Sequence, residues 1–161
     1  MDSINLTTKI LVYNIEECDN DKKKLIECAK HATSKAYAPY STYQVGAAVL
    51  LANGEIITGN NQENAAYPSG LCAERTALFY ANAQYPDVAV DSIAVIAYHD
   101  GDFAENICTP CGSCRQVLVE IENRFSHPVR IIMCGKDKIY EVASIKDLLP
   151  LSFGKESMSQ E

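Results

Sequence analysis

The sequence predicts an α/β fold in which helices cover a β-sheet, with elements in the order αββαβαββ. Apolar residues recur at helical spacing in several segments, and apolar, β-rich runs stand between those segments. Strands that alternate with helices are typical of sheets joined by right-handed, parallel crossover connections. The 161 residues, 47% of them hydrophobic, suffice for one domain with its own core.

The first half of the chain is predicted to form a helix and a β-hairpin. Helical spacing of apolar residues begins at Asp21, and Tyr37-Ala38-Pro39 ends the pattern. The apolar run at 45–52 predicts a strand. Asn53-Gly54 is a hairpin turn signal, so residues 55–59 are interpreted as the returning strand.

The second half alternates helices with strands. Apolar stripes predict helices at 72–83 and 111–124, and a buried type of strand is predicted between them at 92–98. The remaining elements are predicted strands at 129–134 and 138–142 and a last helical turn at 145–149.

The chain is organised as one compact unit with two ends of different character. Residues 1–20 are predicted to be a variable lead-in that is poorly ordered. The domain is expected to span 21–154, and residues 155–161 form a polar tail.

Composition limits the partners and the compartment. The net charge is −7, and Lys22-Lys23-Lys24 is flanked by acidic residues, which favours a small-molecule substrate over nucleic acid. No apolar run approaches twenty residues, so no membrane span is expected. The first residues lack a basic segment leading into an apolar one, so the seven cysteines are interpreted as reduced thiols plus a metal site in a cytoplasmic protein.

Two cysteine motifs indicate the chemistry. Cys72-Ala73-Glu74 is followed by Pro110-Cys111-Gly112-Ser113-Cys114. Three thiols at this spacing can hold three corners of a zinc tetrahedron and leave the fourth corner for water, as in a catalytic site. Cys-x-Glu followed by Pro-Cys-x-x-Cys is also the signature of zinc-dependent deaminases, in which the glutamate carries protons and is not a ligand. Glu74 is therefore the predicted proton carrier.

Both cysteine groups fall where a loop turns into a helix. The positive end of a helix lowers a thiol's pKa and favours the thiolate that binds zinc. Cys111 and Cys114 share a helical face, whereas Cys72 and Glu74 do not, so Cys72 is expected at the helix cap. Three thiolates give the zinc site a formal charge of −1, and Arg75 is the candidate to hydrogen-bond the sulfurs.

Simpler interpretations remain for these residues. The cysteines could be buried structural thiols, and Glu74 could be an ordinary first-turn glutamate favoured by the helix dipole. Cys108 could join the other three in a closed four-cysteine site, which would make the chain a zinc-stabilised binding module. The three histidines lack ligand spacing and receive no role; they are His31, His99 and His127.

Five blocks that stand in order along the chain carry a resemblance. They are Ala38-Pro39-Tyr40-Ser41 with Val45-Gly46-Ala47-Ala48, Asn61-Gln62-Glu63-Asn64-Ala65-Ala66-Tyr67, Cys72-Ala73-Glu74-Arg75-Thr76-Ala77, Pro110-Cys111-Gly112-Ser113-Cys114-Arg115-Gln116, and Leu148-Leu149-Pro150 with Ser152-Phe153-Gly154. Together they resemble the small homotetrameric cytidine deaminases. The resemblance implies a three-layer fold with a mixed, five-stranded central sheet and helices on both faces.

The resemblance also implies contacts to the substrate. Asn61 and Glu63 would hydrogen-bond the ribose 3′-hydroxyl, and the Ala73 backbone N–H would meet the pyrimidine O2. Tyr67 and Phe153 would reach a neighbouring subunit's pocket, so that active sites are shared within a homotetramer.

One position departs from the family pattern. The family usually has Phe where this chain has Tyr43, the residue expected to lie against the pyrimidine ring. Tyrosine keeps the stacking face but adds a hydroxyl that needs a partner.

The implied activity is hydrolytic deamination of cytidine and deoxycytidine in pyrimidine salvage, with one zinc ion per subunit. Zinc-bound water would attack C4, and Glu74 would move the protons. Other deaminase substrates remain open, namely a cytosine-containing antibiotic, a nucleotide or RNA. The ribose contacts and the Phe153 tail favour the free nucleoside.

Overall fold

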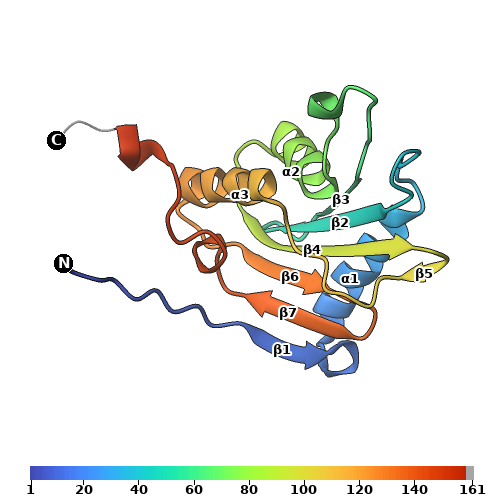
Figure 1. Ribbon diagram of the computed structural model, residues 1–161, viewed down its shortest axis with the longest axis horizontal. Coiled ribbons are helices and arrows are strands. Elements are labelled where there is room, and N and C mark those ends of the chain that lie inside the picture. Colours follow the sequence, from blue (N-terminus) through green and yellow to red (C-terminus); the bar gives the residue numbers. More distant parts are fainter. Residues whose placement is uncertain (159–161) are drawn as a thin grey trace.

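A seven-stranded sheet forms the centre of the computed structural model, which describes residues 1–158 (Figure 1). The strands are β1 (Leu11–Asn14), β2 (Gln44–Leu51), β3 (Ile56–Asn60), β4 (Val90–His99), β5 (Asp102–Phe103), β6 (Arg130–Cys134) and β7 (Lys138–Val142). They lie in the order β1-β7-β6-β4-β2-β3, with β5 paired to β4. The β4–β6 pair is parallel, and the other pairs formed by these strands are antiparallel.

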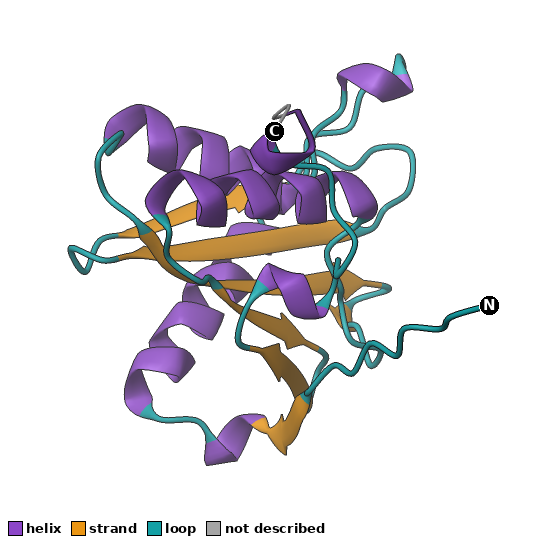
Figure 2. Cartoon of the chain, turned by 90° about the vertical axis from the view of Figure 1, so that its left-hand side faces the viewer, coloured by secondary structure: helices purple, strands orange, loops and turns teal. Residues whose placement is uncertain are grey.

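Helices cover both faces of this sheet (Figure 2). The helix α1 (Asn20–Thr33) packs on one face, and α2 (Ala73–Gln84) and α3 (Gly112–Phe125) lie together on the other. Each face buries its own apolar cluster, and the alternating side chains of β4 and β6 contribute to both clusters. Short 3-10 helices complete the chain: η1 (Ile15–Glu17), η2 (Tyr67–Ser69), η3 (Ile145–Asp147) and η4 (Lys155–Met158).

The α/β class with helices on both faces is confirmed, but the predicted count of five strands is wrong. The segment expected to be a poorly ordered lead-in contains β1, which pairs antiparallel with β7. Three of the four β1 residues are exposed, so the strand lacks the apolar alternation by which strands are recognised. The two-residue strand β5 follows Asp100 and Gly101, which both have positive φ and reverse the chain.

The ends of the predicted helices shift by a few residues. Asp19 caps α1 by accepting a hydrogen bond from the backbone N–H of Lys22, and the helix ends at Thr33, before the predicted stop. The last helical turn is the 3-10 helix η3. Residues 155–158 of the polar tail form η4, and the rest of that tail, 159–161, lies outside the described residues.

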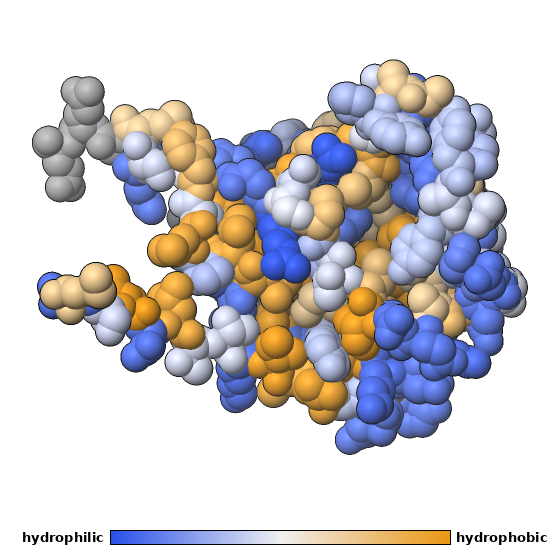
Figure 3. All heavy atoms as spheres, viewed as in Figure 1, coloured by the Kyte–Doolittle hydropathy of each residue, from blue (hydrophilic) through white to orange (hydrophobic). Residues whose placement is uncertain are grey.

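Apolar side chains are exposed where the two terminal segments leave the body of the protein, on the left of Figure 3. The exposed residues there include Leu6 and Ile10 near the N-terminus and Leu151 and Phe153 near the C-terminus. Across residues 1–158, no helix combines the length and the apolar character needed to cross a bilayer.

Candidate active site

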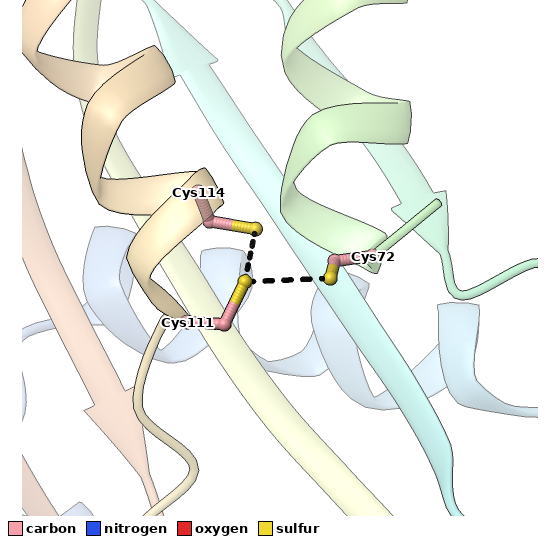
Figure 4. Close-up of side chains that lie close together, drawn as sticks. All are labelled: Cys72, Cys111 and Cys114. Atoms are coloured by element: carbon pink, nitrogen blue, oxygen red, sulfur yellow. Dashed lines mark hydrogen bonds between the residues drawn. The ribbon is translucent and has the colours of Figure 1, made fainter. Parts of the chain in front are cut away.

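Three cysteines from two helices meet above the sheet (Figure 4). Cys72 is the N-cap of α2 and Cys111 is the N-cap of α3, whereas Cys114 lies in the first turn of α3 and is fully buried. The Cys111 sulfur lies 3.6 Å from that of Cys72 and 3.5 Å from that of Cys114. All three sulfur atoms lie within 4.8 Å of one another.

This spacing fits a tetrahedral zinc ion. Zinc–sulfur bonds of about 2.3 Å at tetrahedral angles place the sulfurs about 3.8 Å apart. Thiolates are ligands that zinc prefers, and three of them leave one position open. The donor set and its spacing therefore suit zinc.

Cys108 lies outside the cluster. Within the described residues, the group of close metal-ligand atoms consists of Cys72, Cys111 and Cys114. Cys108 lines the same cavity, and burial raises the pKa of its thiol to about 12. The geometry therefore does not support a closed four-cysteine site.

Glu74 is a buried carboxyl group in the first turn of α2. It is 4% exposed and lines the cavity beside Cys72. Burial, followed by the negative charge of Cys72, raises the pKa of Glu74 to about 6. A carboxyl group with a pKa in this range can both accept and donate a proton near neutral pH.

Arg75 reaches the sulfur of Cys72. Its Nη2 lies 3.8 Å from Cys72 Sγ. A hydrogen bond from Cys114, together with Arg75, lowers the pKa of Cys72 to about 5, which favours the thiolate. The structure thus brings together the predicted cation and one predicted zinc ligand.

A cavity of about 730 Å³ opens beside the cysteines. Tyr43, Asn61, Glu63, Ala73 and Tyr67 are among its lining residues, so five of the six predicted substrate contacts lie around one space. The volume lies in the range usual for small-molecule sites, which is about 300–1,000 Å³.

Asn61 and Glu63 hold the facing wall of the cavity. Asn61 accepts a hydrogen bond from the Val45 N–H at 2.7 Å and donates one to the Tyr43 carbonyl at 2.8 Å. Glu63 accepts from the Tyr40 N–H at 2.9 Å and from the Ser41 hydroxyl. Those bonds, that of Ser41 foremost, hold the pKa of Glu63 below its usual value.

Ser41 belongs to the site although the sequence did not predict a role for it there. Its bond to Glu63 joins residues 22 positions apart. No local pattern could have revealed this contact, because it depends on how the loop before β2 lies against the loop after β3.

The remaining predicted residues differ in position. Ala73 begins α2, where a backbone N–H lacks an intrahelical acceptor. Tyr67 lies on η2 at the cavity and is 80% exposed. Phe153 is 61% exposed and lies outside the residues that line the cavity, while its carbonyl accepts a hydrogen bond from Gln116 at 2.7 Å.

The zinc-ligand spacing agrees with a comparison to known families. Residues 19–126 match the family described as the cytidine and deoxycytidylate deaminase zinc-binding region. The chain belongs to this family. The matched range includes the three clustered cysteines and Glu74.

Individual deaminases of known sequence or structure are similar over most of the chain. The cytidine deaminase of Sporosarcina psychrophila is 41% identical over 86% of this chain and 96% of the relative, and that of Mycobacterium tuberculosis is 35% identical over 89% and 97%. The crystal structure of cytidine deaminase from Burkholderia pseudomallei has a TM-score of 0.66 at 40% identity, covering 81% of this chain and 98% of that one. The M. tuberculosis structure has a TM-score of 0.67 at 32% identity and covers 84% and 99%. The chain is thus an enzyme of the cytidine deaminase type.

Proposed function

We propose that this enzyme hydrolyses the exocyclic amino group of cytidine and deoxycytidine to give uridine or deoxyuridine and ammonia. The observation that carries the proposal is a cluster of three cysteine sulfurs beside one cavity, which the buried Glu74 lines together with Cys72 and Cys111. Three thiolates can hold a zinc ion with one position open, and the neighbouring carboxyl group can transfer protons.

In this proposal Cys72, Cys111 and Cys114 hold one zinc ion per subunit. A bound zinc ion supplies Lewis-acid activation of water at neutral pH. Arg75 stabilises the Cys72 thiolate through the contact at 3.8 Å and offsets part of the negative charge of the ligand set.

Glu74 moves the protons. As a carboxylate it accepts a proton from the water that attacks C4 and delivers it to N3 of the pyrimidine. It then takes the proton of the new C4 hydroxyl group and passes it to the amino group, so that the C4–N bond breaks, the C4 carbonyl forms and ammonia leaves. The pKa of about 6 suits both directions of transfer, because the group changes its protonation state near neutral pH.

The nucleoside is oriented by the wall of the cavity. We assign the pyrimidine O2 to the Ala73 N–H, the ribose 3′-hydroxyl to Asn61 and Glu63, and the face of the base to Tyr43. The Glu63 carboxylate has acceptor capacity beyond its bonds to Tyr40 and Ser41. Contacts at the 3′ position leave the 2′ position free, so deoxycytidine is expected to react as well.

The charges at the cavity favour a nucleoside over a nucleotide. Among the described residues that line it, Arg75 is the cationic one, and its guanidinium is directed at Cys72. A phosphate group would need a free basic partner. The net charge of −7 likewise argues against nucleic-acid substrates.

The assembly is proposed to be a homotetramer with shared active sites. Tyr67 and Phe153 are 80% and 61% exposed, which suits aromatic side chains that a second subunit covers. The seven free cysteines fit a reducing compartment, so we propose a cytoplasmic enzyme of pyrimidine salvage.

The decisive experiment mixes the purified enzyme with cytidine and follows the loss of ultraviolet absorbance. We expect conversion to uridine, and we expect Glu74→Gln to slow it by about 10²–10⁴-fold while zinc content stays unchanged. The matched control is Glu120→Gln, since Glu120 is an exposed helical glutamate outside the cavity and its loss should leave the rate unaltered.

A zinc-loaded enzyme that leaves cytidine and deoxycytidine unchanged would refute the proposal. It would direct attention to other cytosine-containing substrates. Wild-type turnover in Glu74→Gln would instead refute the assignment of the proton carrier.

A further inference from the structure

Thr42 adopts a backbone conformation that threonine rarely takes. Its φ is +58°, and a β-branched side chain in this left-handed region is a conformational outlier. Such a conformation persists where surrounding contacts hold it in place. Thr42 directly precedes Tyr43, which lines the cavity, so a change in the Thr42 backbone would displace the Tyr43 ring.

His99 supplies contacts to both residues. Its Nδ1 lies 3.3 Å from the Thr42 carbonyl oxygen and 3.5 Å from Thr42 Oγ1. Its ring centroid lies 5.6 Å from that of Tyr43, with the two planes tilted by 53°. This separation and tilt are typical of favourable aromatic pairs.

The sheet explains why His99 lies there. The β2–β4 register pairs Gln44 with Tyr98, so continuing it by one position sets Tyr43 opposite His99. His99 is the last residue of β4, and Asp100 after it begins the tight turn into β5. The position of His99 is therefore determined by β4, independently of the loop that it contacts.

Hydrogen bonds from Asn61 and within the loop hold Tyr43 and the backbone N–H of Thr42. The Tyr43 carbonyl accepts a hydrogen bond from Asn61 at 2.8 Å, and the Tyr43 N–H donates to Ser41 Oγ at 3.0 Å. The Thr42 N–H donates to the Ala38 carbonyl at 3.0 Å. In the described structure, His99 is the side chain outside this loop that bonds to the strained residue itself.

We propose that His99 is a positioning residue, which holds Thr42 in its strained conformation and thereby keeps the Tyr43 ring against the pyrimidine base. This inference rests on the proposed function, because it takes Tyr43 as the surface on which the base lies. Without His99, Thr42 relaxes and the Tyr43 ring loses its lateral support. The cysteine cluster and Glu74 are on other elements and stay in place.

The test compares His99→Ala with wild type. We expect KM for cytidine to rise about tenfold, with kcat within about twofold of wild type and zinc content unchanged. His127→Ala is the matched control. His127 is 41% exposed against 36% for His99, and each histidine contacts an aspartate, but His127 lies away from the cavity. Its loss should leave KM unchanged.

A second background tests the route through Thr42. Asparagine tolerates positive φ, so Thr42→Asn should need less support from His99. The KM increase caused by His99→Ala should therefore be smaller in the Thr42→Asn background. An equal increase in both backgrounds, or a KM unaffected by His99→Ala in an active enzyme, would overturn the inference.

A readout without turnover separates this inference from the proposed function. The ¹⁹F signal of fluorotyrosine at position 43 should shift in His99→Phe, which keeps an aromatic ring beside Tyr43 but removes the bond to Thr42, and stay unshifted in His127→Ala. If wild type fails to deaminate cytidine but the signal shifts, the proposed substrate is wrong and the positioning role stands. An unshifted signal in His99→Phe refutes the positioning role.

Discussion

The sulfur atoms of Cys72 and Cys111 lie 3.6 Å apart although 39 residues separate them in the chain. Each cysteine is the N-cap of its helix, so their proximity means that the positive ends of α2 and α3 meet at one point. This convergence brings the cysteine sulfurs together, and Arg75 favours negative charge on the sulfur of Cys72.

The first prediction separates ligands from the neighbouring thiol. Cys108→Ser should keep wild-type zinc content, because Cys108 lies outside the cluster. Cys114→Ser should lose zinc and with it the activity, since it removes one of the three proposed ligands. Metal analysis of both purified variants checks this. Loss of zinc in Cys108→Ser would instead support the closed four-cysteine site.

The second prediction concerns the contact that positions α2. A Cβ added to Gly59 would lie 2.4 Å from the Ala77 nitrogen and 2.7 Å from the Ala73 oxygen, both backbone atoms of α2. Gly59→Ala should therefore displace this helix, lower the free energy of unfolding by about 2 kcal/mol or more and weaken zinc binding. Chemical denaturation and zinc titration measure the two effects.

Gly112, at the start of α3, serves as the control for Gly59. A Cβ on Gly112 of α3 would meet nothing within 4 Å, so Gly112→Ala should leave zinc binding intact and raise the free energy of unfolding by up to about 1 kcal/mol. Equal behaviour of the two alanine variants would contradict the close approach of β3 and α2.

The third prediction concerns a buried carboxylate away from the cavity. Glu122 of α3 is 5% exposed and accepts hydrogen bonds from the N–H groups of Val129 and Ile145 and from the Ser144 hydroxyl, at 2.8–2.9 Å. Glu122→Ala leaves two buried backbone N–H groups and the partly buried Ser144 hydroxyl without this acceptor, so the free energy of unfolding should fall by about 3–5 kcal/mol. Urea denaturation measures the loss, and the exposed Glu120→Ala should change it by less than about 0.5 kcal/mol.

The fourth prediction is a dependence of stability on alkaline pH. Burial, with the hydrogen bond that Tyr13 donates to Glu141, raises the pKa of the Tyr13 phenol above its ordinary value of 10.0. Below pH 10 the phenol is neutral in both the folded and the unfolded chain, so its contribution to the free energy of unfolding is fully present. Above pH 10 the Tyr13 phenol ionises in the unfolded chain before it ionises in the folded one, so this contribution is lost as the pH rises.

Tyr13→Phe isolates this effect. Between pH 9 and 11, the free energy of unfolding should fall more in wild type than in the variant. The difference between the two proteins should stay below about 1.4 kcal/mol per pH unit, because the Tyr13 ring is partly exposed to solvent. Parallel loss in both proteins would show that Tyr13 ionisation contributes nothing to the docking of β1 on β7.

The sequence predicted the elements that have a clear local pattern. Helical spacing around Leu25 and Leu118 and the β-rich runs of β2 and β4 indicated the layers, because burial on one face imposes a period on the chain. The strand β1 was missed, since its partner β7 lies more than a hundred residues away and most of β1 is exposed.

What the sequence alone determined about the site is the set of cysteines, their place at helix starts, and Glu74 beside them. Cys72 with Glu74, and Cys111 with Cys114, are each spaced within one helical turn, which a sequence records directly. The tertiary structure alone decided that Cys108 stays outside the cluster, that Ser41 bonds Glu63, and that His99 contacts Thr42, 57 positions before it. Such contacts depend on strand order and register, which bring distant segments together and leave no periodic trace in either one.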